Sequence, residues 1–295
     1  MDLFRRFLRN PLSLTGFIIL LFFALVAALA PLIAPPQGPV GTSPYLIPRA
    51  GWGTIPLPPG PGHLFGTAEG QYDIFYGIVW GTRTAFGVGL AVVGASLIIG
   101  LVVGSVAGFF GGWLDELMMR VTDIFLAFPY LVAAVVVTTI LGKGLDKVII
   151  ALILFGWMGY ARLIRSSVLQ VKEMEFVEAA RALGQKTWKI ILRHVLPNSI
   201  YPLLVQASMD IGSVVLTAAG LSFLGLGAET GFADWGQLVS FARNWIKGEP
   251  GAPFQYWYTV FWPSLAIVLF VLGWNLVGDG VRDVMDPRLR QGRNS

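Results

Sequence analysis

Charged residues are scarce in this chain of 295 residues: they make up 13% of it, about half the share in an ordinary globular domain. A chain with so few charges cannot cover a folded core with a water-facing surface, but it can face lipid. Hydrophobic residues make up 55%, and the mean hydropathy is +0.68. The composition excludes an ordinary water-soluble domain and predicts a protein with several membrane spans.

Cysteine is absent, and histidine is limited to His63 and His194. Their scarcity excludes disulfides and thiolate metal sites and leaves too few histidines for a histidine-rich metal centre. No HExxH sequence is present, which argues against a metal-dependent intramembrane enzyme. The net charge of +4 indicates basic cytoplasmic loops rather than nucleic-acid binding, because membrane proteins concentrate Lys and Arg there.

A phosphate-binding loop of the form G-x-x-x-x-G-K-[ST] is also missing, since Lys186-Thr187 lacks the glycine that should precede it. We therefore expect that the chain does not bind ATP by that route. It is predicted to be no enzyme, to bind no cofactor or metal itself, and to receive energy from a partner.

Gaps between charged residues mark six predicted membrane helices. Each helix needs about 20 residues to cross roughly 30 Å of hydrocarbon. Four gaps hold no charge and are long enough, namely 10–48, 84–114, 124–142 and 250–278. A further helix is predicted at 148–166, with Arg162 and Arg165 at the membrane interface. The last lies within 196–227, contains Asp210 and ends at the glycine-rich turn SFLGLG.

Glycine and proline predict local features of these spans. Gly100, Gly104 and Gly108 repeat at four-residue spacing, which predicts close packing against another helix. Pro129 and Pro202 fall within the third and fifth predicted spans, where they would kink the helix or free carbonyl groups.

The distribution of Lys and Arg predicts that both termini are cytoplasmic. With that orientation, 15 of the 21 basic residues lie in inside segments. Arg5, Arg6 and Arg9 before the first apolar run resemble the start of a signal peptide, but Pro31 directly follows the A-x-A sequence. An uncleaved membrane anchor is therefore the better interpretation.

The predicted organisation has four parts. A cytoplasmic segment with the first helix (1–35) precedes an external loop (36–82), in which dense proline predicts irregular coil. A core of five helices (83–283) follows and contains an internal loop (167–196). The core's external loop (228–257) holds DWGQLVSFARNWIKG, a predicted short helix on the surface, and a cytoplasmic tail (284–295) ends the chain.

The internal loop carries the strongest pattern, EMEFVEAARALGQKTWKIILRHVLP at 173–197. Apolar residues recur at helical spacing on both sides of Gly184: Phe176, Ala179, Ala180 and Leu183 before it, then Trp188, Ile191, Leu192 and Val195. Gly184 supplies a turn open to positive φ, so a helix–turn–helix hairpin is predicted. Pro197 suits the first turn of the next helix.

The pattern alone leaves two roles for this hairpin. Small residues at its centre and the acidic Glu173, Glu175 and Glu178 would suit docking on a partner. Basic residues would equally suit an amphipathic helix in the lipid headgroups.

Glu178-Ala179-Ala180, Gly184 and Leu196-Pro197 resemble the EAA signature of permease subunits of binding-protein-dependent ABC importers. LSFLGLG, Asp234-Trp235-Gly236, NLVGDGVRDVMDPRLR, and Asn10-Pro11 after a basic segment are similar to the C-type subunit of the peptide (dipeptide/oligopeptide/nickel) subclass. Two places depart from the family pattern. His194 stands where an aliphatic residue is usual, and GTAEGQYD before the second span keeps Gly66, Thr67 and Asp73 but loses an inner Gly-Arg.

The resemblance implies an all-α integral membrane protein with six transmembrane helices and the type I ABC importer permease fold, located in the cell (inner or plasma) membrane. It implies that cytoplasmic ATPase subunits, which bind ATP-Mg, dock on the hairpin. The residues that it assigns to this coupling are Glu178, Ala179, Ala180, Gly184, Leu196 and Pro197. A second homologous permease, two ATPase subunits and an external solute-binding protein are the implied partners, and peptides or a related small solute the implied cargo.

An ion-coupled secondary transporter or channel without ATPase partners is the alternative. Such a protein needs charges within the membrane, and Asp210 is the acidic residue well inside a predicted span. Asp210 is either a hydrogen-bonding residue between helices or a group in the solute pathway. The sequence shows no inverted repeat with matched broken helices.

Overall fold

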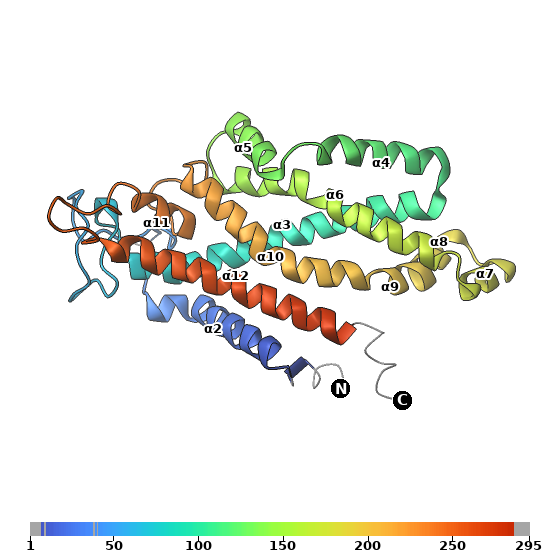
Figure 1. Cartoon of the computed structure of the whole chain (residues 1–295), viewed down its shortest axis with the longest axis horizontal. Helices are drawn as coiled ribbons and strands as arrows, with labels where there is room; N and C mark the ends of the chain where they lie inside the picture. Colours follow the sequence, from blue (N-terminus) through green and yellow to red (C-terminus); the bar gives the residue numbers. More distant parts are fainter. Residues whose placement is uncertain (1–6, 9, 38, 40, 286–295) are drawn as a thin grey trace.

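The structure, a computed structural model, describes residues 7, 8, 10–37, 39 and 41–285. Arg5, Arg6 and Arg9 and the tail from residue 286 onward, with Arg288, Arg290 and Arg293, therefore lie outside the described residues. The described part is almost entirely helical, with long helices side by side along the longest axis of the molecule (Figure 1).

Five helices are long and apolar enough to cross a membrane: α2 (Pro11–Ile33), α3 (Ile74–Phe110), α6 (Leu145–Val171), α10 (Tyr201–Phe223) and α12 (Trp257–Met285). A bent pair, α4 (Gly112–Leu126) and α5 (Tyr130–Leu141), provides a sixth span if it is counted as one. These elements correspond to the six predicted spans.

The third span breaks where Pro129 predicts a kink. α4 and α5 meet at 84°, and Pro129 is the N-cap of α5, where its missing N–H costs no helical hydrogen bond. Pro202 lies in the first turn of α10 and not inside the span. The kink predicted there is therefore wrong, because a proline in the first turn leaves the helix intact.

Arg162 and Arg165, which the sequence predicts to lie at the membrane interface, both pair with carboxylates of α4. Arg165 donates from Nε and Nη2 to the two carboxylate oxygens of Asp115, each at 2.6 Å, and Arg162 pairs with Asp123. These contacts hold the bent third span against α6.

Gly100, Gly104 and Gly108 pack α3 against α6, as predicted. A Cβ on Gly100 would lie 2.4 Å from Cβ of Tyr160, and one on Gly104 would lie 2.1 Å from the carbonyl oxygen of Ala161. No larger side chain fits at this spacing, so the glycines set the distance between the two helices.

Arg83 lies inside α3 and donates a hydrogen bond to the backbone of α2. Pro31 has no N–H and leaves the carbonyl of Ala27 without its usual helical donor. Arg83 Nε donates to that oxygen at 2.5 Å, and its guanidinium lies 5.0 Å from the ring of Trp80. The helix itself begins at Ile74, within the segment expected as external loop, because Asp73 caps its first turn by accepting from the Tyr76 N–H at 2.8 Å.

The two loops predicted to be external form one cap at the end of the bundle where α11 (Trp235–Phe241) lies (Figure 1). Ile47 N–H donates to the Gly231 carbonyl at 2.8 Å, and Ala233 N–H donates to the Tyr45 carbonyl at 2.7 Å. The proline-rich segment is irregular coil with one short 3₁₀ turn (Glu69–Gln71), which confirms the prediction. The short helix also exists, but it is buried rather than on the surface, since Trp235 and Leu238 are 2% and 0% exposed.

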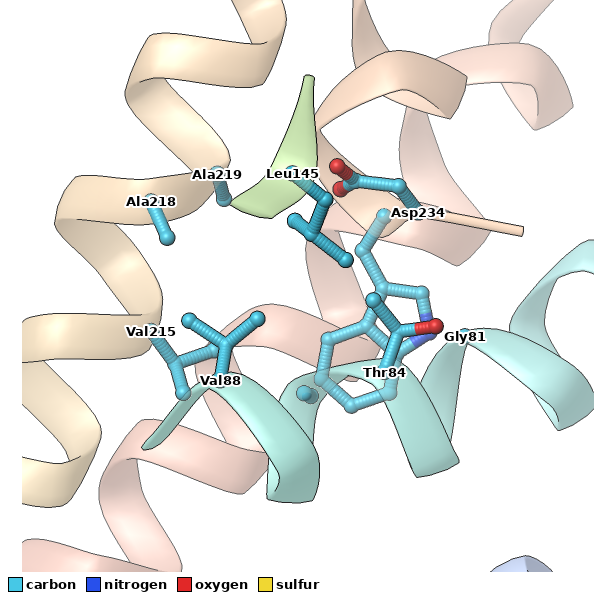
Figure 2. Close-up of a pocket in the computed structure, with 10 residues that line it drawn as sticks. Gly81, Thr84, Val88, Leu145, Val215, Ala218, Ala219 and Asp234 are labelled. Carbon is cyan, nitrogen blue, oxygen red and sulfur yellow. The ribbon is translucent and has the colours of Figure 1, made fainter. Parts of the chain in front are cut away.

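Asp234 joins this cap to α10. Its carboxylate accepts from the Ser222 hydroxyl at 2.5 Å and caps α11 by accepting from the Gly236 N–H at 2.8 Å. Burial raises the pKa of Asp234 above the usual carboxyl value, and the hydrogen bonds oppose that shift in part. Figure 2 shows Asp234 beside a pocket that it shares with Leu145, Val88 and Val215; its volume of about 20 Å³ is too small for a solute.

Candidate functional site

The internal loop is a hairpin, as predicted. α7 (Glu175–Ala182) and α8 (Thr187–Ile190) are joined at Gly184, which has φ +72°. Gly184 N–H donates to the Arg181 carbonyl at 2.9 Å, and Gln185 N–H donates to the Ala180 carbonyl at 3.1 Å. This pair of bonds is the Schellman ending, in which the residue with positive φ is usually glycine. The turn that the sequence predicts is therefore confirmed.

One side of the hairpin is anchored to the helix bundle. Val177, Ala180, Ile190 and Val195 are all 5% exposed or less. The Arg181 guanidinium lies 5.6 Å from the ring of Phe109 at the end of α3. These contacts fix the hairpin to the membrane helices, so a force on its tip reaches the bundle.

The other side of the hairpin is open. Leu183, Trp188 and Phe176 are 82%, 57% and 41% exposed, and Glu178 and Ala179 are exposed beside them. The predicted single apolar face is wrong at Ala180, which points inward. Neighbouring residues on a helix are about 100° apart, so Ala179 lies on the exposed side of the hairpin and Ala180 on the side that packs against the bundle.

The returning arm leads straight into α10. A π-helical turn, η2 (Ile191–Val195), is followed by the short α9 (Leu196–Ser199) and then by α10. Leu196 and Pro197 lie in α9, at the base of the hairpin and not at its tip with Gly184. His194 Nε2 lies 3.1 Å from Oε1 of Gln185 and so ties the base of the returning arm to the turn. In that place it forms a polar contact that an aliphatic residue could not form.

Asp210 lies in α10 and is hydrogen bonded to α6. Tyr160 Oη donates to Oδ2 of Asp210 at 2.6 Å, and Gln206 Nε2 donates to Oδ1 at 2.8 Å. Neither partner is predicted from the sequence. Gln206 could have been found from its position four residues before Asp210, but nothing in the sequence pairs Tyr160 with it.

The hairpin and the Asp210 cluster are mechanically connected. α6 ends at Val171, four residues before α7 begins, and the returning arm continues into α10 (Figure 1). The Tyr160–Asp210 hydrogen bond therefore joins the two helices that carry the hairpin. Among the described residues, no group of three or more His, Asp or Glu side chains is placed to hold a metal ion.

Two family models match separate parts of the chain. Residues 100–291 match the family described as binding-protein-dependent transport system inner membrane component. Residues 1–47 match the N-terminal TM domain of oligopeptide transport permease C.

Curated relatives align over most of their own length. The chain is 38% identical over 289 residues to a dipeptide transport system permease protein of Alkalihalophilus pseudofirmus (98% of this chain, 90% of the relative). It is 36% identical over 295 residues to an oligopeptide transport system permease protein of Bacillus subtilis (98% and 90%). It is 40% identical over 233 residues to a nickel transport system permease protein of Escherichia coli K12 (79% and 82%).

A solved structure shares the fold. In inward-facing conformations of the MetNI methionine ABC transporter, one chain aligns with a TM-score of 0.58 at 19% identity, covering 72% of this chain and 98% of that one.

Proposed function

This chain belongs to the family of binding-protein-dependent transport system inner membrane components and is a permease subunit of an ABC importer, and from that premise we propose that its α7–α8 hairpin couples ATP hydrolysis on partner subunits to solute uptake. It is a multi-pass membrane protein with the type I importer permease fold. No relative supports an ion-coupled carrier that works without ATPases.

The observation that carries the proposal is the two-sided hairpin. Its exposed side presents Leu183, Trp188 and Phe176 together with the acidic Glu178. Large apolar side chains beside a charge are better suited to contact with a partner protein than to exposure to water. Its other side is packed on α3, α6 and the returning arm. Closure of two ATPase subunits on ATP-Mg would push this hairpin, and the displacement would bias the helices between inward-facing and outward-facing arrangements.

Glu178, Ala179 and Gly184 shape the docking surface in this proposal, and Ala180 packs the hairpin against the bundle behind that surface. Leu196 and Pro197 set the angle at which the returning arm enters α10. The hairpin end of the bundle then faces the cytoplasm, and the cap of external loops faces the solute-binding protein. The remaining partner is a second homologous permease, because one six-span bundle is too small to enclose a solute pathway by itself. The chain itself performs no covalent chemistry.

Peptides are the proposed cargo class. The relatives are named for dipeptides, oligopeptides and nickel, and the matched N-terminal domain belongs to an oligopeptide permease.

Co-purification tests the proposal. The tagged chain, solubilised from native membranes in mild detergent, should bring down ATPases with a phosphate-binding loop and a second permease with an EAA sequence, both identified by mass spectrometry. Recovery of this chain alone, as a monomer or homo-oligomer, would contradict the proposal and favour the ion-coupled alternative.

A further inference from the structure

A cavity of about 320 Å³ lies between α3, α5, α6 and α10, near the middle of the membrane helices. Asp210 lines it, nine residues after the start of α10 and 13 before its end. At about 1.5 Å per residue, the carboxylate is therefore roughly 14 Å and 20 Å from the two ends of that helix. The volume falls within the range of small-molecule sites, about 300–1,000 Å³.

Asp210 is the one charged side chain among the residues that line this cavity. None of the ion pairs found among the described residues includes it. A carboxylate at this depth in a membrane is costly unless it has a cation or an equivalent partner. Tyr160 and Gln206 each occupy one position on its oxygens, and further acceptor positions remain, since a carboxylate has about four.

The other polar groups of the cavity also present acceptors. Ser213 and Thr217 donate their hydroxyl protons to backbone carbonyls of α10, at 2.9 and 2.8 Å, and Tyr130 donates to the Leu152 carbonyl at 3.3 Å. The oxygens of all three still have free lone pairs. A site rich in acceptors suits a ligand group that only donates, such as an ammonium with three N–H donors and no acceptor.

Ser96 is a second, independent indication of a ligand. Its side chain lines the cavity and is 1% exposed, and its hydroxyl has no hydrogen-bond partner among the described residues. A buried hydroxyl without a partner is unfavourable, because it has lost its hydrogen bonds to water without replacing them. Gly156 leaves it room, because a Cβ there would lie 2.5 Å from the Ser96 oxygen.

We propose that this cavity is a transient binding site for a primary ammonium group of the solute, with Asp210 as its counter-ion. The inference rests on the proposed function, because free peptides carry an α-ammonium group that is protonated at neutral pH, its pKa being about 8. The site lies between the two helices that carry the hairpin. Movement of α6 against α10 changes the Tyr160–Asp210 contact and with it the affinity for the cation.

Direct binding tests the site. The importer, purified with its partner subunits and placed in lipid nanodiscs without the solute-binding protein, is dialysed against radiolabelled L-alanyl-L-alanine, with N-acetyl-L-alanyl-L-alanine as the matched probe that lacks the ammonium. We expect the wild type to bind the free dipeptide at least tenfold more tightly than the acetylated one. Asp210→Asn, which keeps the size of the side chain but removes its charge and replaces one acceptor oxygen with an amide donor, should remove that preference.

Two glycine variants separate the cavity from general damage. Neither Gly159 on α6 nor Gly87 on α3 has an atom within 4 Å of an added Cβ, but Gly159 lines the cavity and Gly87 does not. Gly159→Val should fill the cavity and weaken dipeptide binding at least tenfold, whereas Gly87→Val should bind like the wild type.

Four results would overturn the inference: no binding by the wild type, equal binding of the two probes, an unchanged preference in Asp210→Asn, or equal losses in the two glycine variants. The same preparation is checked for ATPase subunits. Their presence together with any of these results leaves the proposed function standing, and their absence contradicts the proposed function itself.

Discussion

At the scale of single residues, Gly184 determines the shape of the hairpin, since its φ of +72° lies in the region that L side chains rarely adopt. A β-branched residue there costs about 1–3 kcal/mol of strain. We predict that Gly184→Val uncouples ATP hydrolysis from uptake and leaves the amount of protein in the membrane unchanged. The number of solute molecules imported per ATP, measured in proteoliposomes, should fall at least fivefold.

Gly184→Asn is the matched control. Asparagine tolerates the left-handed conformation better than other residues with a side chain, and no atom lies within 4 Å of an added Cβ at this position. It should keep most of the coupling. Normal uptake by Gly184→Val would show that the turn has no role in coupling.

Asp234 gives a pH dependence with a defined sign. Burial raises its pKa in the folded protein, so the folded state keeps the proton at pH values where the unfolded chain, with a pKa of about 3.9, has released it. The contribution to stability is then complete below about pH 4 and is lost as pH rises toward the folded pKa.

We predict that Asp234→Asn, which keeps the N-cap but does not titrate, gains stability relative to the wild type as pH rises from 4 to 8. Thermal unfolding of the two proteins in the same detergent measures the difference. A difference in unfolding midpoint (Asp234→Asn minus wild type) that stays constant or falls as pH rises would contradict this assignment.

At the scale of elements, the ion pairs between α4 and α6 hold the broken third span. The Asp115 and Arg165 side chains are 15% and 33% exposed, so removing one partner leaves a partly buried charge. Arg165→Met should lower the free energy of unfolding by about 1–3 kcal/mol, measured by thermal unfolding in detergent.

The pair Glu116–Arg120 on α4 is the control, with side chains 63% and 74% exposed. An exposed pair contributes about 0–1 kcal/mol, so Arg120→Met should change stability much less. Equal effects of the two substitutions would mean that the Asp115–Arg165 contact contributes nothing particular.

The elements also show what sequence can and cannot predict. The spans follow from apolar runs of about 20 residues. The glycine contacts of α3 and the turn at Gly184 follow from patterns within about ten residues, because helix periodicity and backbone conformation are local properties. The predicted span starts after Arg83 because the spans are predicted from gaps between charged residues. α3 is therefore longer than the sequence predicts, since it contains Arg83. The partner of Arg83, the carbonyl that Pro31 frees, lies 56 residues away, and no local pattern reveals it.

The buried position of α11 has a similar cause. Its polar and aromatic residues are typical of a surface helix, but Asp234, Gln237 and Trp235 find hydrogen-bond partners on α3, α10 and the neighbouring loop. In the same way, Tyr160 joins the site only because α6 and α10 pack together. Contacts between distant segments decide these features.

At the scale of the whole molecule, the two ends of the helix bundle carry different parts of the chain. The start of α2 and the end of α12 lie toward the end where α7 projects, and the cap of external loops occupies the other end (Figure 1). The hairpin is the projecting part of the described bundle, and α6 and α10 connect it to the cavity at Asp210. In the proposed importer, an ATPase subunit covers the hairpin.

Site-directed cross-linking tests for this contact, because the chain contains no cysteine and each introduced one is unique within it. Leu183→Cys on the hairpin and Trp52→Cys in the external cap replace side chains that are 82% and 91% exposed. A photoreactive maleimide on each, activated in native membranes, labels the neighbouring protein for mass spectrometry. We predict an ATPase with a phosphate-binding loop on the Leu183 variant and none on the Trp52 variant; no ATPase at Leu183, or one at Trp52, would contradict the account.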